Sequence, residues 1–168
     1  MKKSILVLGF SLALLVFSGS DVLAQASKEI SEPVTSTWYS TTKVLPLGED
    51  RNFITTDGFG VLISDEGKGL FHEATAHSVS AYLMERGVSK NLVGYVSYFL
   101  KNGDKVFAEI VAEVKTGVPT KGKTRIIGGT GKCVNIQGNW EYTGYRLTPA
   151  AEGIVQGYNK LTIKYRLP

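Results

Sequence analysis

Cysteine and histidine are almost absent from this sequence. Its 168 residues include one cysteine, Cys133, and two histidines, His72 and His77. One cysteine cannot form a disulfide within the chain, so we expect a buried thiol that packs as a small apolar group. The two histidines are five positions apart, whereas the helical zinc motif places its two histidines four apart. We therefore predict no disulfide within the chain and no metal site.

The chain also lacks a strong excess of charge. It has 19 Lys and Arg against 15 Asp and Glu, and its basic residues are spread along the sequence. Nucleic-acid-binding domains usually concentrate such residues on one face, so no nucleic-acid partner is predicted. The glycine-rich segment ending in Gly131-Lys132 is not a phosphate loop, because Cys133 follows where that motif has Ser or Thr. No cofactor is predicted.

A long apolar run occurs only at the N-terminus. Two lysines precede an apolar stretch at 5–17, and small residues follow at Ala24 and Ala26. This order is typical of a cleavable secretory signal peptide, and the run is shorter than the roughly 20 residues of a membrane span. We predict a signal peptide at 1–26, a single domain at 27–168 without a transmembrane segment, and a periplasmic or secreted location. Mass spectrometry of the exported protein would identify its first residue.

The remaining chain has no segment with the pattern of a long amphipathic helix. Short runs rich in β-branched and aromatic residues alternate with Gly, Asn and Asp. The runs cover 34–43, 51–63, 70–84, 92–101, 105–115, 124–127, 138–147 and 156–167. Asn102-Gly103 between two of them predicts a hairpin, since both residues tolerate positive φ. We expect residues 27–33 to form a loose lead-in.

Alternation inside these runs indicates half-buried antiparallel strands. In the last run, Leu161, Ile163 and Tyr165 alternate with charged or polar residues. The run at 70–84 also contains good helix formers, but its β-branched and small residues favour a strand. About eight strands with hairpin spacing predict an all-β fold, either a closed antiparallel barrel or a sandwich.

Acidic and tyrosine side chains on these runs are candidates for a site inside a barrel. An acid held in an apolar cavity would have a raised pKa and could act as a general acid or base. The alternative is that these positions simply face water. The candidate ligand-binding residues are Tyr95, Tyr98, Glu109, Glu113 and Tyr142. No catalytic residue can be assigned.

The segment 127–138 resembles a signature of the allene oxide cyclase and dirigent-like β-barrels. Its matching residues are Gly128, Gly129, Thr130, Gly131, Ile136 and Gly138. Glycines permit a tight turn here, and Ile136 is expected to plug one end of a barrel. Cys133 departs from the pattern, because the family more often has a bulky aromatic residue there.

The resemblance implies an eight-stranded antiparallel closed barrel of calycin-like type, with an apolar interior and often a homotrimeric assembly. Plant members either cyclise a fatty-acid epoxide or direct the coupling of phenoxy radicals. No catalytic residue of the cyclases maps onto this chain, and fold alone does not define function.

Three functions remain open at this stage. The first is an exported barrel that binds a small hydrophobic or aromatic ligand, for which eight strands leave just enough room. The second is an envelope structural or interaction module without a cavity. The third is a cyclase or isomerase acting on a lipid-derived or phenolic substrate, which requires a buried acid at the cavity floor.

Overall fold

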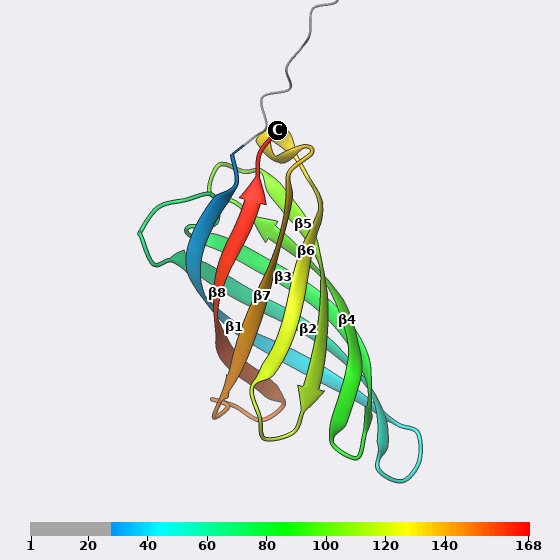
Figure 1. The fold of residues 1–168 in the computed structure, drawn as a ribbon. Coiled ribbons are helices and arrows are strands. Elements are labelled where there is room, and N and C mark those ends of the chain that lie inside the picture. Colours follow the sequence, from blue (N-terminus) through cyan, green and yellow to red (C-terminus); the bar gives the residue numbers. More distant parts are fainter. Residues whose placement is uncertain (1–27) are drawn as a thin grey trace, which may run out of the picture.

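Eight antiparallel strands close into one barrel in the computed structural model of the protein, which describes residues 28–168 apart from the side chain of Lys90 (Figure 1). The strands are β1 (Ile30–Pro46), β2 (Arg51–Ser64), β3 (Ala74–Glu85), β4 (Val88–Phe99), β5 (Lys105–Lys115), β6 (Thr120–Gly129), β7 (Gln137–Leu147) and β8 (Ile154–Arg166). Each strand pairs with its neighbour in sequence, and β8 pairs with β1. The predicted eight-stranded closed barrel is thus confirmed. The predicted signal peptide lies outside the described residues.

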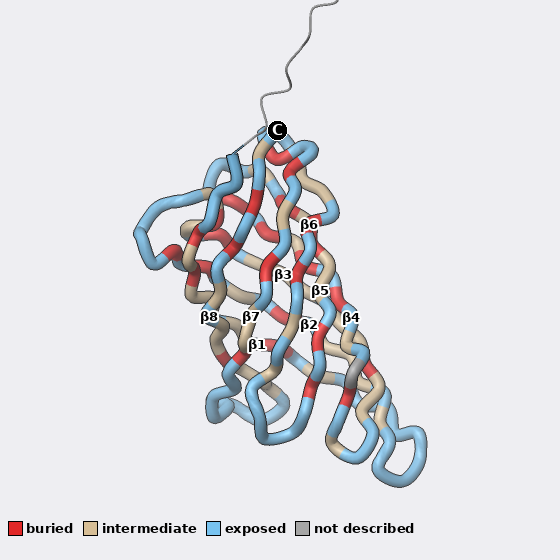
Figure 2. Tube along the Cα trace, in the orientation of Figure 1, coloured by how far each residue is buried: buried red, intermediate tan, exposed pale blue. Residues whose placement is uncertain are grey.

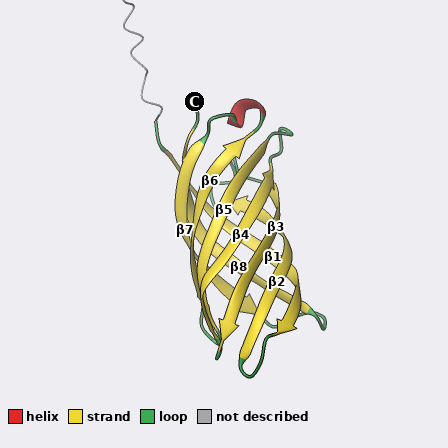
Figure 3. Ribbon diagram, turned by 90° about the vertical axis from the view of Figure 1, so that its right-hand side faces the viewer, coloured by secondary structure: helices red, strands yellow, loops and turns green. Residues whose placement is uncertain are grey.

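The two ends of the barrel differ. Four short hairpin loops, between β1 and β2, β3 and β4, β5 and β6, and β7 and β8, lie together at what we call the open end, at the bottom of Figure 1. The other three loops and the C-terminus lie at the closed end, where a 3-10 helix, η1 (Gly131–Cys133), forms part of the cover (Figure 3). In the described part of the chain, no helix has the length and hydropathy needed to cross a membrane.

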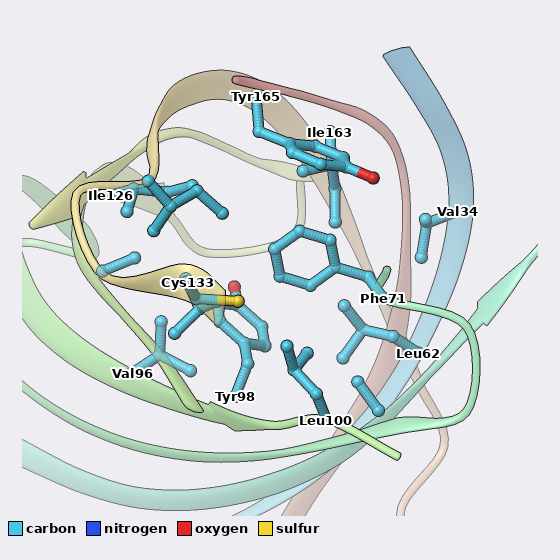
Figure 4. Packing of buried hydrophobic residues seen from close by; sticks show 14 of the residues in the cluster. Val34, Leu62, Phe71, Val96, Tyr98, Leu100, Ile126, Cys133, Ile163 and Tyr165 are labelled. Carbon is cyan, nitrogen blue, oxygen red and sulfur yellow. The ribbon is translucent and has the colours of Figure 1, made fainter. Parts of the chain in front are cut away.

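The hydrophobic core occupies the closed end rather than the whole interior. Its buried residues are Val34, Leu62, Phe71, Ala74, Val96, Tyr98, Leu100, Val106, Ala108, Ile126, Cys133, Ile136, Trp140, Ile163 and Tyr165. Figure 2 shows buried positions recurring along the strands, and Figure 4 shows Phe71 at the centre of this cluster. The alternation predicted for the last strand is confirmed, since Ile163 and Tyr165 are buried between exposed neighbours.

Several predicted boundaries are wrong: β4 and β6 each begin four residues earlier than predicted, and two other differences concern the closed end. The expected loose lead-in at 27–33 is ordered from Ile30 onward, because β1 pairs with β8 along that stretch and Ile30 lies opposite Tyr165. The strand predicted from residue 70 begins only at Ala74, since Gly69 and Glu73 have φ values of 124° and 59° that interrupt extended backbone. The segment 65–73, which we call the capping loop, instead folds over the closed end.

Candidate ligand-binding cavity

A cavity of about 380 Å³ fills the barrel between the core and the open end. Residues of all eight strands line it, and every one occupies an inward-facing strand position. Leu62, Tyr98 and Trp140 of the core form its floor, whereas Thr42, Met84 and Arg146 lie toward the hairpins. Small-molecule pockets usually measure about 300–1,000 Å³, so the space suits one small ligand.

Hydroxyl groups are concentrated on the wall formed by β1, β2 and β3. The members of this hydroxyl wall are Ser36, Ser40, Thr42, Thr56, Ser78 and Ser80. Thr56 Oγ1 and Ser80 Oγ lie 2.6 Å apart and share one hydrogen bond. That bond uses one of the two hydroxyl hydrogens, so the other hydrogen and several lone pairs remain for a ligand.

Aromatic and aliphatic side chains dominate the opposite wall, on β4 to β8. The rings of Tyr98 and Trp140 lie 6.2 Å apart at the floor. Tyr142 lies over Gly122 on the neighbouring strand, where a Cβ atom would collide with its ring. Burial raises the pKa of Tyr142 to about 12 and raises that of Tyr98 further, so both phenols stay neutral at physiological pH. They can donate hydrogen bonds but cannot act as ready bases.

Trp38 projects from β1 into the cavity and lies against β8. Its Nε1 donates to Asn159 Oδ1 over 3.3 Å, which fixes the orientation of the indole ring. The ring covers Gly157 of β8, a position without a side chain to compete for the space. Since the sequence contains only two tryptophans, Trp38 and Trp140, both of its indoles lie in the cavity wall.

Phe71 of the capping loop plugs the barrel beneath the cavity floor. The side chain is fully buried, and its ring meets those of Tyr98, Trp140 and Tyr165 edge to face at 5.4, 6.1 and 5.6 Å between centroids. Such geometry is favourable for aromatic pairs. The capping loop therefore closes one end of the barrel with an apolar plug (Figure 4).

A buried carboxylate holds this plug in place. Glu32, which is 4% exposed, accepts hydrogen bonds from the Phe71 backbone N–H at 3.2 and 3.3 Å and from the Tyr165 hydroxyl at 3.4 Å. Burial raises the pKa of Glu32, and the backbone N–H groups of Phe71 and Leu70 oppose this rise only in part. Glu32 thus acts as a latch between β1 and the capping loop.

The raised pKa of Glu32 predicts a specific pH dependence of stability. Its folded pKa lies above the ordinary value of 4.5, so the folded state binds the proton more tightly than the unfolded state. The stability that this tighter proton binding adds to the folded state is fully present below about pH 4.5. It is lost as the pH rises through the pKa of Glu32 in the folded protein. In urea unfolding at a series of pH values, Glu32→Gln should remove this component from the slope, whereas Glu49→Gln on an exposed loop should not. Identical slopes for the wild type and Glu32→Gln would contradict this account.

The structure separates the sequence-predicted site residues into two groups. Tyr98 and Tyr142 line the cavity, and their role in ligand binding stays a prediction. Tyr95, Glu109 and Glu113 lie on the outer wall, which corrects the expectation that they face the interior. Tyr95 is 57% exposed. Strand alternation explains the outcome, since Ile110 and Val114 of the same strand as the two glutamates point inward and leave the odd-numbered positions outside.

The glycine-rich segment of the family resemblance serves the closed end. Thr130 Oγ1 accepts a hydrogen bond from the Lys105 backbone N–H at 2.8 Å, and Gly131 has a φ of 53°, which glycine adopts without strain. Ile136 is 3% exposed in the core, at the end of the barrel that it was expected to plug. The thiol of Cys133 is buried as expected, and burial raises its pKa.

Sequence reasoning missed most of the cavity lining, including Trp38, Trp140 and Arg146, and also missed the latch residue. The hydroxyl wall consists of small polar residues whose common face becomes visible only once the strands are in register. Glu32 was assigned to a lead-in, although the spacing Glu32, Val34, Ser36, Trp38 follows the period of a strand and could have indicated an inward position.

Comparison with known proteins finds structural similarity over most of the chain at low sequence identity. The pterocarpan synthase dirigent protein GePTS1 aligns with 89% of this chain and 98% of its own, at 13% identity and a TM-score of 0.48. The pterocarpan synthase dirigent protein PsPTS1 aligns with 83% of this chain and 96% of its own, at 10% identity and a TM-score of 0.47. The chain is thus similar in structure to dirigent proteins. No protein-family model and no curated protein sequence matches it.

Proposed function

We propose that this protein binds one small hydrophobic or aromatic molecule inside its barrel. The observation that carries the proposal is the 380 Å³ cavity, which is lined by aromatic and aliphatic side chains on all sides and has most of its Ser and Thr hydroxyl groups on the wall of β1 to β3. Apolar surface supplies affinity and a few polar groups supply orientation in pockets of this kind. A planar molecule with one hydrogen-bonding edge matches both walls.

The lining favours binding over the two alternatives. An interaction module without a cavity would have a packed interior, whereas this barrel is packed only toward its closed end. A cyclase or isomerase would need an acid or base in the cavity, and none of the described lining residues is a carboxylate or an imidazole. The buried pair Glu32 and Tyr165 belongs to the capping-loop latch, behind the Phe71 plug. Binding of a small apolar ligand requires neither a carboxylate nor an imidazole in the cavity.

The two tryptophans provide the test. Titration with the neutral fluorescent probe N-phenyl-1-naphthylamine should quench the emission of Trp38 and Trp140 and saturate at one probe per chain. The enhanced probe emission should follow the same isotherm, because both signals report the same site. Absence of saturable binding, with this probe and with a mixture of lipids and phenols, would overturn the proposal.

We further propose that the protein assembles as a homo-oligomer through one side of its outer wall. Exposed apolar residues gather on the outer faces of β1 to β4, and we call this set the outer apolar face: Tyr39, Phe59, Val61, Val79, Val93 and Tyr95. Strand pairing places Val79 directly opposite Tyr95, and Phe59 stacks on His77 at 4.6 Å. The outer positions of β6 and β8 instead carry exposed lysines, two on each strand. Asp57 and His77, 2.8 Å apart, lie among the residues of the outer apolar face as a polar pair. Large exposed apolar patches usually mark interfaces.

Light scattering coupled to gel filtration would test this assembly. The wild type should elute with the mass of an oligomer, for which the family resemblance predicts three copies. The double variant Val79→Lys, Tyr95→Lys should elute as a monomer, because it places two charges in the apolar contact. Thr162→Lys, on the outer wall of β8, should leave the mass unchanged. A monomeric wild type would contradict the proposal.

A further inference from the structure

One charged side chain reaches the cavity. Among the described lining residues, Arg146 of β7 is the only one that carries a charge at neutral pH. It occupies an inward-facing position next to the last residue of β7, so its guanidinium lies at the mouth and not at the floor. The residue itself is exposed, which means that the group remains hydrated when the cavity is empty.

Arg146 has no acidic partner within the described part of the chain. Arg51, Arg125 and Arg166 each form an ion pair with a glutamate, at 2.8, 2.7 and 3.3 Å, whereas no carboxylate of residues 28–168 lies within ion-pair distance of Arg146. Its partner across the strand pair is Gly157, which offers no side chain. Arg146 therefore keeps its five N–H donors for solvent or for a bound molecule.

We propose that Arg146 selects ligands that carry a carboxylate at one end of an apolar body. This inference rests on the proposed binding function and names the ligand class for the same cavity. The apolar body would lie against Trp140 and Tyr98, and the carboxylate would accept two parallel hydrogen bonds from the guanidinium at the mouth. Because the mouth is open, the carboxylate keeps part of its hydration, and the pair avoids the desolvation cost of a buried salt bridge.

A matched pair of competitors isolates the contribution of the contact between Arg146 and a ligand carboxylate. 2-Naphthoate and 2-naphthamide have nearly the same shape and differ in charge, and each would be used to displace N-phenyl-1-naphthylamine from the full-length protein. The wild type should bind the carboxylate about tenfold more tightly than the amide, as one charge-assisted contact allows. Raising the salt concentration should narrow this ratio, since the contact is exposed.

Two arginine variants complete the experiment. Arg146→Gln should bring the ratio to about one, because it should weaken the binding of 2-naphthoate about tenfold more than the binding of 2-naphthamide. Arg86→Gln is the matched control, because Arg86 lies in a hairpin at the same end, has no ion pair among the described residues and does not line the cavity. It should retain the wild-type ratio. Unfolding curves would verify that both variants fold.

The outcomes separate this inference from the proposed function. A probe that binds while the wild type shows no preference for the carboxylate overturns the role of Arg146 and leaves the binding function intact. If Arg146→Gln and Arg86→Gln lower the preference for the carboxylate equally, the preference comes from the general positive charge of this end of the barrel. That result also overturns the role of Arg146. If Arg146→Gln weakens the binding of both competitors by the same factor, the ratio keeps its wild-type value, which indicates a structural role for Arg146 and overturns the inference. Failure of the probe to bind the wild type overturns both proposals together.

Discussion

Replacing Ile110 by tryptophan should lower the affinity for N-phenyl-1-naphthylamine at least about tenfold. Ile110 points into the cavity from β5 and pairs with Gly94 on one side and Thr124 on the other. Gly94 contributes no side chain, so the larger indole would extend into the ligand space instead of displacing the wall. The change would be measured by probe titration and checked by circular dichroism, since an added side chain in a packed region costs about 1–3 kcal/mol.

Glu113→Trp is the matched control for this blocking variant. Glu113 lies on the same strand but faces outward, and no ion pair involving the described residues holds it. The control introduces the same indole outside the cavity, so the affinity for the neutral probe should stay within about twofold of the wild type. If both variants lose affinity for the probe to a similar extent, the probe binds on the outer wall, which contradicts the cavity as the binding site. This comparison also tests the sequence-based expectation that Glu113 contributes to ligand binding.

Truncating the plug should have the largest effect on stability. Phe71→Ala removes a fully buried ring and three edge-to-face contacts, and losses of this kind cost about 3–5 kcal/mol. The midpoint of thermal unfolding should fall by roughly 10 °C for a domain of this size. Urea unfolding followed by circular dichroism would provide the free energy independently of the tryptophan signal.

Phe53→Ala controls for the loss of an aromatic ring as such. Phe53 is 39% exposed on the outer wall of β2, so its truncation should change the free energy of unfolding by less than about 1 kcal/mol. Phe71→Leu should recover part of the lost stability, because it restores apolar volume without the aromatic contacts. If Phe71→Ala unfolds like the control, the capping loop is not an integral part of the core, and the closed end must be held by the strands alone.

Side-chain alternation made the strands predictable. A period of two is a local property, so Leu161, Ile163 and Tyr165 identified their strand and its buried face without knowledge of any partner. The Asn102-Gly103 turn was readable for the same reason, and the structure has Gly103 at a φ of 87° between β4 and β5. The number and spacing of such strands left a barrel and a sandwich open, and the family resemblance implied the eight-stranded closed barrel.

The capping loop shows where local patterns fail. Leu70 and Phe71 are apolar residues that suit a buried strand, yet they lie outside β3, and Glu32, nearly 40 positions earlier in the chain, accepts the Phe71 backbone N–H. That hydrogen bond exists only once β1 has entered the barrel. The same dependence explains why Glu109 and Glu113 were candidates: alternation assigns them to one face, but only closure of the barrel decides which face is inside.

The sequence by itself determined the strands, their alternating faces and the tight turns, because these depend on residues a few positions apart. Only the tertiary structure decided what the interior contains. Eight strands in register bring the small hydroxyl residues and the tryptophan of β1 to β3 to face the tryptophan and the arginine of β7, which lie at least 60 positions further along the sequence. The cavity exists because large core side chains gather at the closed end, while serines, threonines and glycines occupy inward positions toward the open one.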